Sequence, residues 1–245
     1  MILVVPCYNE AGRMKPAVFL EAVQGAGDLD LLFVDDGSVD ATFRILDELS
    51  TKSGGRISVL RLAKNIGKAE AVRAGMLAAF ARRPDYVGFW DADLSTPLTP
   101  VPEFLAVFRS RPAVEIVIGA RVKLLGRDIR RNLLRHYCGR MFATAASLAL
   151  GIGVYDTQCG AKMFRATAVI RQLFTSPFRS QWIFDVEILA RYLATCEAAE
   201  AERRIYELPL KNWTDVPGSK LKLRDAPQAI WDLARISREV GRLRR

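Results

Sequence analysis

Short apolar runs alternate with amphipathic stretches through the first 120 residues of the chain. The apolar runs predict strands at residues 2–5, 31–34, 57–60, 86–90 and 115–119. Helical spacing of apolar residues predicts helices at residues 14–24, 40–52, 68–82 and 99–110. Strands and helices that alternate at this length are typical of an α/β fold. We therefore predict a mainly parallel central sheet with helices on both faces.

The pattern changes after residue 120, where basic and apolar side chains interleave up to residue 140. We predict a helix at residues 128–150, a loop at 151–153, a helix at 185–195 and a strand near 204–210. The C-terminal segment again has a helical period of apolar residues. The predicted organisation is one domain at residues 1–225, with a basic amphipathic helix at 226–245 packed on or beside it.

Two carboxylates, Asp91 and Asp93, follow the apolar run Tyr86–Trp90. In open α/β sheets, ligands bind in the crevice beyond the carboxyl ends of the strands. Carboxylate oxygens are ligands that Mg²⁺ and Mn²⁺ prefer, so we predict that the pair holds one of these ions against a substrate diphosphate. A solvated turn is the alternative, because aspartate is common in turns.

Polar groups also follow the first two predicted strands. Residues 6–10 read Pro-Cys-Tyr-Asn-Glu, and Asp35 and Asp36 follow the second strand. Such carboxylates can accept hydrogen bonds from a ribose or a base, and the tyrosine ring offers a stacking face. The functional interpretation is stronger for Asp35, because an acidic side chain directly after an apolar strand is costly unless it is used. For Asp36, forming the turn is the alternative. Lys68 opens the next predicted helix and can meet a phosphate or these carboxylates. A helix start with an exposed lysine is the alternative, and this segment by itself favours it.

The charge of the chain points to an anionic partner. Lys and Arg number 36 against 27 Asp and Glu, which gives a net charge of +9. Phosphorylated sugars, a membrane face and nucleic acid all fit this charge. The acidic strand ends would repel nucleic-acid phosphates, so we do not expect a nucleic-acid-binding module.

Cysteine spacing and hydropathy predict the redox compartment of the protein and its relation to the membrane. Cys7, Cys138, Cys159 and Cys196 form no CxxC pair, which disfavours a zinc site and predicts free thiols in a reducing cytosol. Met1 leads directly into an apolar strand, so no signal peptide is expected. The longest uncharged stretch, residues 141–155, is shorter than the roughly 20 residues of a spanning helix. We expect a protein that is not integral to a membrane.

Five segments occur in a characteristic order and spacing: VVPCYNE, VDDGSVDAT, NIGKAEAVRAG, DADLSTP and GAR. In these segments the chain resembles the family 2 glycosyltransferases, which have the GT-A nucleotide-sugar fold. Three later segments, YDTQCGAKMFR, WIFDVEIL and NWTDVPGSKLKL, look like the branch that transfers a sugar to a polyprenyl phosphate. The dolichyl-phosphate β-glucosyltransferase type is the nearest, and dolichyl-phosphate mannose synthases are more distant. The resemblance covers residues 1–225.

The strand ends and the resemblance together select the site residues. Those expected to bind the donor are Pro6, Tyr8, Asn9, Glu10, Asp35, Asp36, Lys68, Asp91, Ala92, Asp93 and Lys220. Those expected to bind the acceptor are Arg121, Arg130, Arg131 and Gln158. The resemblance implies that Asp91 and Asp93 also ligate the metal. With Arg121 they are the expected catalytic residues.

One departure from the family pattern bears on the donor. Mannose synthases carry an arginine six residues before the lysine that matches Lys220, and this chain has Thr214 there. The loop is therefore more similar to the glucosyl branch. UDP-glucose is the expected donor.

The resemblance implies an inverting transfer, and the nature of the acceptor decides what chemistry it needs. A phosphate monoester has a second pKa of about 6, so at neutral pH it is largely dianionic and hardly needs a base. The enzyme then has to position it in line and neutralise charge. A sugar or small-molecule hydroxyl is the alternative acceptor, and it would need a carboxylate base, for which Asp185 and Glu187 are the candidates.

Two basic and apolar segments suit a membrane surface. In residues 121–140 and 226–245, Lys and Arg can meet anionic headgroups while apolar side chains contact the lipid. A solvated helix surface is the alternative for the C-terminal segment. We expect a cytoplasmic protein that is peripheral to the cytoplasmic face of a membrane.

Overall fold

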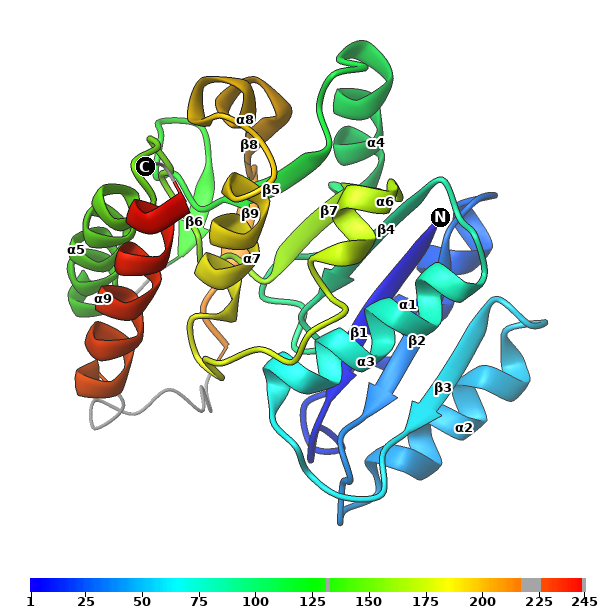
Figure 1. The fold of residues 1–245 in the computed structure, drawn as a ribbon. Helices are drawn as coiled ribbons and strands as arrows, with labels where there is room; N and C mark the ends of the chain where they lie inside the picture. The colour runs from blue at the N-terminus through cyan, green and yellow to red at the C-terminus, as the bar shows by residue number, and fades with distance from the viewer. Residues whose placement is uncertain (131–132, 217–225, 244–245) are drawn as a thin grey trace.

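The computed structural model of this protein describes residues 1–130, 133–216 and 226–243 (Figure 1). The main sheet has seven strands in the order β3-β2-β1-β4-β7-β5-β8. Its strands are β1 (Ile2–Cys7), β2 (Asp30–Asp35), β3 (Ile57–Arg61), β4 (Tyr86–Trp90), β5 (Ile116–Ala120), β7 (Ala161–Arg165) and β8 (Ile205–Pro209). Strand β7 pairs antiparallel with β4 and β5, whereas the other described pairings in this sheet are parallel. The predicted mainly parallel sheet is confirmed.

Helices cover both faces of this sheet, as the alternating pattern predicts. They are α1 (Pro16–Gly25), α2 (Thr42–Lys52), α3 (Lys68–Ala81), α4 (Val101–Ser110), α5 (Leu133–Leu150), α6 (Ala168–Gln172), α7 (Phe184–Leu193), α8 (Ala198–Arg204) and α9 (Ala226–Leu243). Figure 1 shows α3 lying across the front of the sheet, with α5, α7 and α9 side by side at one end.

Alternate residues of each central strand enter different cores. In β1, Ile2 and Val4 belong to the core to which α3, α5, α7 and α9 contribute, whereas Leu3 and Val5 belong to the core to which α1, α2 and α4 contribute. This division follows from the two-residue period of a strand, which turns successive side chains to opposite faces. Burial on both faces explains why these strands read as continuous apolar runs rather than as alternating ones.

The predicted helix at residues 128–150 is wrong at its start. Residues Asp128–Arg130 form a short strand, β6, which pairs with β9 (Asn212–Thr214) in a second sheet, and α5 begins only at Leu133. In this pair Ile129 and Trp213 are buried while the residues that flank them are exposed. The distant partner strand therefore overrides the local helical pattern. Strand β7 and helices α6 and α8 are further elements that the sequence pattern did not predict.

The C-terminal helix α9 packs against α5 and α7, and its residues Leu233 and Ile236 enter the core beside α3. The predicted segment 226–245 extends beyond the last described residue, Leu243. Within the described residues, no helix combines the length and the apolar character needed to cross a bilayer.

Three of the cysteines are free thiols: Cys7 and Cys159 are buried, and Cys196 is partly buried. Burial, together with the charge of Asp156, raises the pKa of Cys159 to about 11. This thiol therefore stays protonated and unreactive at neutral pH.

Candidate active site

The carboxyl ends of several strands bring polar side chains to one edge of the main sheet. Strands β1, β2 and β4 are parallel neighbours, and β5 runs in the same direction because the antiparallel β7 separates it from β4. The residues that end or directly follow these strands are Tyr8, Asp35, Asp91 and Arg121. The structure thus places residues singled out on four separate segments at a common edge.

The two metal-ligand candidates occupy the turn after β4. The Asp91 amide donates to the carbonyl of Gly160 at 3.0 Å, which ties the turn to the start of β7. Asp93 Oδ1 accepts a hydrogen bond from the Ser95 amide at 2.9 Å, and Leu94 between them has a positive φ of 53°. Ala92 is buried beneath the turn. Backbone hydrogen bonds therefore fix the main chain at Asp91 and the carboxylate of Asp93, and Asp93 Oδ2 is not used by the Ser95 amide.

Gly160 makes room for the Asp91 carboxylate. A Cβ atom at position 160 would stand 1.9 Å from Asp91 Oδ2, closer than any side chain can approach. The sequence pattern singled out the segment around Gly160 but not this residue, because the contact joins β4 to a strand some 70 residues later. Glycine here fixes where the carboxylate lies.

A row of alternating charges continues from Asp91 into the core. Lys68 Nζ, at the start of α3, lies 2.6 Å from Asp91 Oδ1. Deeper inside, Lys162 Nζ donates to Asp185 Oδ1 at 2.5 Å and to the carbonyl of Cys159 at 2.6 Å. Lys162 is 1% exposed, so this pair is fully withdrawn from water. These contacts tie β7 to α7 and order the loop that precedes β7.

The protonation of this row follows from burial and neighbours. Burial lowers the pKa of Lys68, but the carboxylates of Asp91 and Asp185 outweigh it, so the pKa of Lys68 is raised and the side chain stays an ammonium. Burial raises the pKa of Asp185, and the charges of Lys162 and Lys68 offset that rise only in part. Asp185 therefore depends on Lys162 to remain ionised inside the protein.

Glu187, the second base candidate, is used to hold a loop. Its Oε2 accepts hydrogen bonds from the amides of Arg179 and Ser180 at 3.0 and 3.1 Å, and its Oε1 lies 2.8 Å from Arg191 Nη2. The side chain is buried. Contacts that hold the loop at Arg179 and Ser180 and the pair with Arg191 thus engage both of its oxygens.

Asp35 and Asp36 are adjacent, but the structure uses them differently. Asp35 is fully buried, and while its Oδ1 accepts from the Ser38 amide at 3.1 Å, its Oδ2 has no hydrogen-bond partner among the described residues. Arg61 Nε lies 3.5 Å from that oxygen. Asp36 instead accepts from the amides of Ile66 and Gly67 at 2.8 and 3.0 Å. Asp35 thus keeps an acceptor for a ligand, and Asp36 holds the loop that carries Lys68.

The segment after β1 is linked to the segment after β2. Asn9, with a positive φ of 51°, donates its amide to Ser38 Oγ and accepts the Val39 amide at its Oδ1, both at 3.0 Å. Glu10 is buried and forms an ion pair with Arg13. Pro6 and Tyr8 are partly exposed at the same edge. Asn9 therefore shapes the edge at which Tyr8 is partly exposed.

Arg121 is held by a carboxylate that sequence reasoning did not single out. Its Nε and Nη2 donate to the two oxygens of Asp156 at 2.6 and 2.8 Å, and its guanidinium lies 5.2 Å from the centre of the Trp213 ring. Burial raises the pKa of Asp156, but the Arg121 charge outweighs it, so the net pKa of Asp156 is lowered. Among the described residues no acceptor contacts Nη1, which leaves that group for an anionic ligand.

The remaining acceptor candidates differ in how they are placed. Arg130 is exposed on β6 and pairs with Asp128 at 2.9 Å. The backbone amide of Gln158 donates to Asp156 Oδ1 at 3.2 Å. The side-chain Nε2 of Gln158 is buried and has no hydrogen-bond partner among the described residues. Arg131 and Lys220 lie outside the described residues.

The donor set at this edge fits a divalent cation shared with a substrate. Within the described residues no group of three or more acidic, histidine or cysteine side chains is arranged to hold a metal by itself. Two carboxylates, Asp91 and Asp93, supply hard oxygen ligands, and Mg²⁺ is commonly held by one or two carboxylates plus phosphates and water. The residues present therefore fit a metal that a diphosphate completes.

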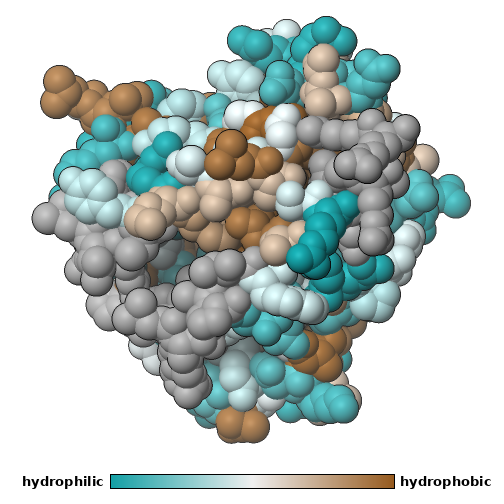
Figure 2. Space-filling view, turned by 60° about the vertical axis from the view of Figure 1, so that its left-hand side comes forward, coloured by the Kyte–Doolittle hydropathy of each residue, from teal (hydrophilic) through white to brown (hydrophobic). Residues whose placement is uncertain are grey.

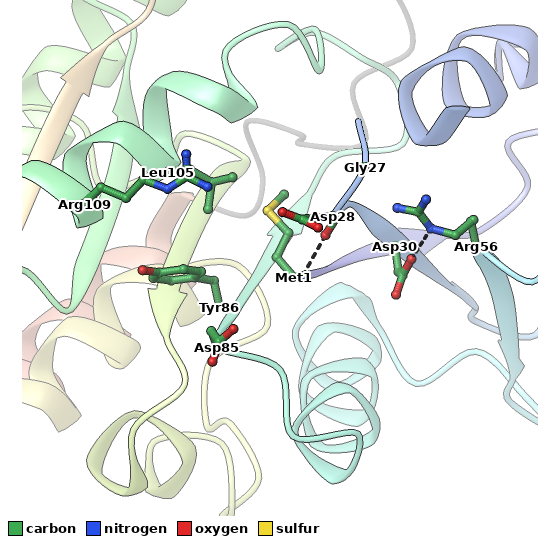
Figure 3. A pocket seen from close by; sticks show the side chains of 9 residues that line it. All are labelled: Met1, Gly27, Asp28, Asp30, Arg56, Asp85, Tyr86, Leu105 and Arg109. Atoms are coloured by element: carbon green, nitrogen blue, oxygen red, sulfur yellow. Dashed lines mark hydrogen bonds and ion pairs between the residues drawn. The ribbon is translucent and has the colours of Figure 1, made fainter. Parts of the chain in front are cut away.

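A separate cavity of about 590 Å³ lies at the opposite, amino-terminal edge of the sheet (Figure 3). Its lining includes Met1, Asp30, Arg56 and Asp85, and two polar contacts there are internal, from the Met1 amino group to the Asp28 carbonyl and from Arg56 to Asp30. None of the residues singled out from the sequence lines it. The carboxyl-end edge is therefore the candidate site.

Comparison with known sequences identifies the family. The family model described as Glycosyl transferase family 2 matches residues 2–173. The dolichyl-phosphate beta-glucosyltransferase of Drosophila melanogaster is 36% identical over 235 residues, covering 89% of this chain and 68% of that protein. The protein of the same name from Homo sapiens is 31% identical over 238 residues, with the same coverage of 89% and 68%. The chain thus spans about two thirds of the length of these relatives.

Solved structures share the fold at low sequence identity. Glucosyl-3-phosphoglycerate synthase from Mycobacterium tuberculosis, in complex with Mn²⁺ and UDP-glucose, superposes with a TM-score of 0.66 at 16% identity, covering 98% of this chain and 78% of that one. TarS 1–349 of S. aureus in complex with UDP-GlcNAc gives a TM-score of 0.61 at 14% identity, covering 96% and 65%. At these identities the likeness concerns the fold, and it confirms the predicted GT-A architecture.

Proposed function

This chain belongs to glycosyl transferase family 2, and from that premise we propose that it moves glucose from UDP-glucose to a polyprenyl or dolichyl phosphate with inversion. The observation that carries the proposal is the 36% identity to a dolichyl-phosphate beta-glucosyltransferase over 89% of the chain. The carboxylate edge described above supplies groups for both halves of such a donor.

The nucleoside half of the donor is assigned to the ends of β1 and β2. Asp35 Oδ2 is a buried acceptor that receives no hydrogen bond from the described residues and has Arg61 Nε, at 3.5 Å, as an ion-pair partner. It can accept a hydrogen bond from an N–H or hydroxyl of the donor. Tyr8 lies partly exposed at the same edge and offers its ring for stacking, with Pro6 and Glu10 beside it.

The diphosphate half is assigned to Asp91 and Asp93 through Mg²⁺ or Mn²⁺. When bound, the ion acts as a Lewis acid for the leaving diphosphate. Lys68, within 2.6 Å of Asp91, and Arg121, through its Nη1, add positive charge at the same edge. These side chains position the diphosphate and neutralise its charge, and Lys220 is proposed to join them.

The two candidate bases favour a phosphate acceptor over a hydroxyl. Asp185 is committed to a buried ion pair with Lys162, and Glu187 accepts hydrogen bonds that hold its loop. A proton taken up by either would weaken these contacts. A phosphate dianion attacks without a base, so the site needs only orientation and charge.

The function is tested by a donor screen with radiolabelled nucleotide sugars and a short polyprenyl phosphate. We expect label in the lipid from UDP-glucose, and its loss in EDTA. In calorimetry UDP should bind more tightly than GDP. Label that enters only a saccharide or small-molecule acceptor would support the alternative transferase, and tighter binding of GDP would overturn the donor assignment.

We propose that the acceptor reaches this site from a membrane surface beside β6 and α5. Leu125 is fully exposed and Leu124 half-exposed, in a loop that also carries Lys123 and Arg127 and leads into β6 with Arg130. Exposed apolar side chains also follow one face of α5, namely Tyr137, Met141 and Leu148. Figure 2, which brings the α5 and α9 side forward, shows apolar side chains standing among hydrophilic ones. Basic and apolar groups so mixed suit an anionic lipid surface.

A vesicle assay tests the acceptor role of Arg130 at this surface. With polyprenyl phosphate embedded in anionic vesicles, Arg130→Ala is expected to raise the acceptor KM severalfold, because the change removes a cation that meets the acceptor phosphate. UDP affinity should not change, since the donor lies at the strand ends. Arg109→Ala, at the far end of α4, is the matched control. An unchanged KM, or a wild-type protein that does not sediment with anionic vesicles, would contradict this placement.

A further inference from the structure

We propose that Lys68 is a built-in counter-ion of the metal-binding carboxylate: it competes with the divalent cation for Asp91 and turns toward Asp185 and the donor diphosphate when the cation binds. This inference rests on the proposed function, because it takes Asp91 and Asp93 to be the metal ligands. It adds a reason for the cation and the nucleotide to bind together.

The contact itself is the first observation. Lys68 Nζ lies 2.6 Å from Asp91 Oδ1, so the ammonium occupies one of the oxygens that a metal would need. An ammonium and a divalent cation cannot share that position, because both are cationic and both require the same lone pair. Binding of the metal must therefore displace Lys68.

The two partners differ in their freedom to move. The backbone amide of Asp91 donates a hydrogen bond to the Gly160 carbonyl, which fixes the main chain there. Asp91 Oδ2 lies in the space that a side chain at position 160 would otherwise fill. The backbone before Lys68 is fixed by Asp36, which accepts the amides of Ile66 and Gly67. The Lys68 side chain, in contrast, is 46% exposed and has a flexible four-carbon stem. It is the side chain that yields.

A second carboxylate is ready to receive the displaced ammonium. Asp185 attracts Lys68 electrostatically, and Lys162 holds Asp185 in place through its Oδ1. Burial disfavours the ionised form of Asp185, and the positive charges of Lys162 and Lys68 both oppose that effect. A donor diphosphate at the same edge provides further negative charge. Lys68 thus gains partners only when both metal and nucleotide are present.

This arrangement predicts cooperative binding. When no nucleotide is bound, the Lys68 ammonium lowers the affinity of Asp91 for the cation. When no cation is bound, Lys68 stays paired with Asp91 and adds less to the binding of the diphosphate. Each ligand therefore increases the affinity for the other by the same factor, as linkage requires.

Mn²⁺ binding to the donor-free protein tests the inference without any catalytic readout. We expect Lys68→Met to bind Mn²⁺ about tenfold more tightly than the wild type in calorimetry or electron paramagnetic resonance, because a unit charge next to the ligand oxygen has been removed. We also expect UDP to increase the Mn²⁺ affinity less in this variant than in the wild type. Lys68→Gln is a second neutral replacement, should Lys68→Met not fold.

Lys64→Met is the matched control, since it removes one positive charge from the same exposed loop away from Asp91. Its Mn²⁺ affinity should equal that of the wild type. An equal increase in Mn²⁺ affinity in the Lys64 and Lys68 variants would show that only the net charge matters, and it would overturn the inference. Weaker or unchanged Mn²⁺ binding in the Lys68 variants would also overturn it. If the wild type binds no Mn²⁺ even with UDP, the metal assignment of the proposed function fails instead.

Discussion

Replacing Asp93 with asparagine is expected to lower kcat by about a thousandfold while leaving the fold intact. The change removes one anionic ligand of the proposed metal, whose stabilisation of a leaving diphosphate amounts to several kcal/mol, and a thousandfold corresponds to about 4 kcal/mol. Asparagine keeps the side-chain oxygen that accepts the Ser95 amide at 2.9 Å, so the turn after β4 should persist. Turnover at saturating UDP-glucose and polyprenyl phosphate is the measurement, with circular dichroism to confirm folding.

Asp40→Asn is a closely matched control for this experiment. Asp40 Oδ1 accepts the amide of Thr42, two residues on, at 2.9 Å, which is the same turn geometry as that of Asp93 and Ser95. Asp40 lies before α2 and has no assigned role in binding the donor. We expect wild-type turnover from it. An Asp93→Asn enzyme within a few-fold of wild type, or full activity in EDTA, would show that the carboxylate pair does not hold an essential metal.

Replacing Lys162 with methionine is expected to reduce the free energy of unfolding by about 3–5 kcal/mol at pH 7. The substitution leaves Asp185 buried without its ion-pair partner and removes the donor to the Cys159 carbonyl. Methionine has a similar length, so little of the loss should come from a cavity. Urea denaturation followed by tryptophan fluorescence measures the effect.

The loss of stability should depend on pH in a defined direction. Burial already raises the folded-state pKa of Asp185, and removal of Lys162 raises it further. A carboxyl group whose folded-state pKa lies above its unfolded value of about 3.9 lowers the free energy of unfolding as the pH rises from the unfolded pKa to the folded one. The difference between variant and wild type should therefore be smaller near pH 4 than at pH 7.

Two further variants distinguish the effect of losing the buried ion pair from the effect of losing any lysine charge. Lys211→Met breaks an exposed pair with Glu103 at 2.7 Å and should cost less than about 1 kcal/mol. Adding Asp185→Asn to Lys162→Met should recover part of the stability, since the unpaired charge is then gone. A Lys162→Met protein as stable as the Lys211→Met protein would mean that water reaches Asp185.

The alternation of apolar runs and helical periods was sufficient to predict most of the sheet and the carboxylate edge. Strands β1, β2 and β4 are buried on both faces, so their apolar runs are unambiguous, and their parallel order follows from the helices between them. Because parallel strands end at one edge of a sheet, the sequence pattern predicts that Asp35 and Asp91 lie at the same edge.

The elements that the pattern did not predict depend on distant partners. Strand β7 carries Lys162 among apolar residues, and that lysine is acceptable in the core only because Asp185 meets it from α7. The three residues of β6 become a strand because β9 pairs with them from more than 80 residues away. Such short elements gain too little from local propensity to be recognised alone.

The sequence by itself determined which side chains reach the site edge, and the tertiary structure decided what each one does there. Asp35 and Asp36 are chemically identical neighbours, yet only Asp36 meets the amides of the loop before α3. Arg121 looks like a free cation in the sequence, but Asp156 takes two of its donor groups. The physical reason is range: strand ends are set by local periodicity, whereas the partner of a charge is set by whichever distant segment packs beside it.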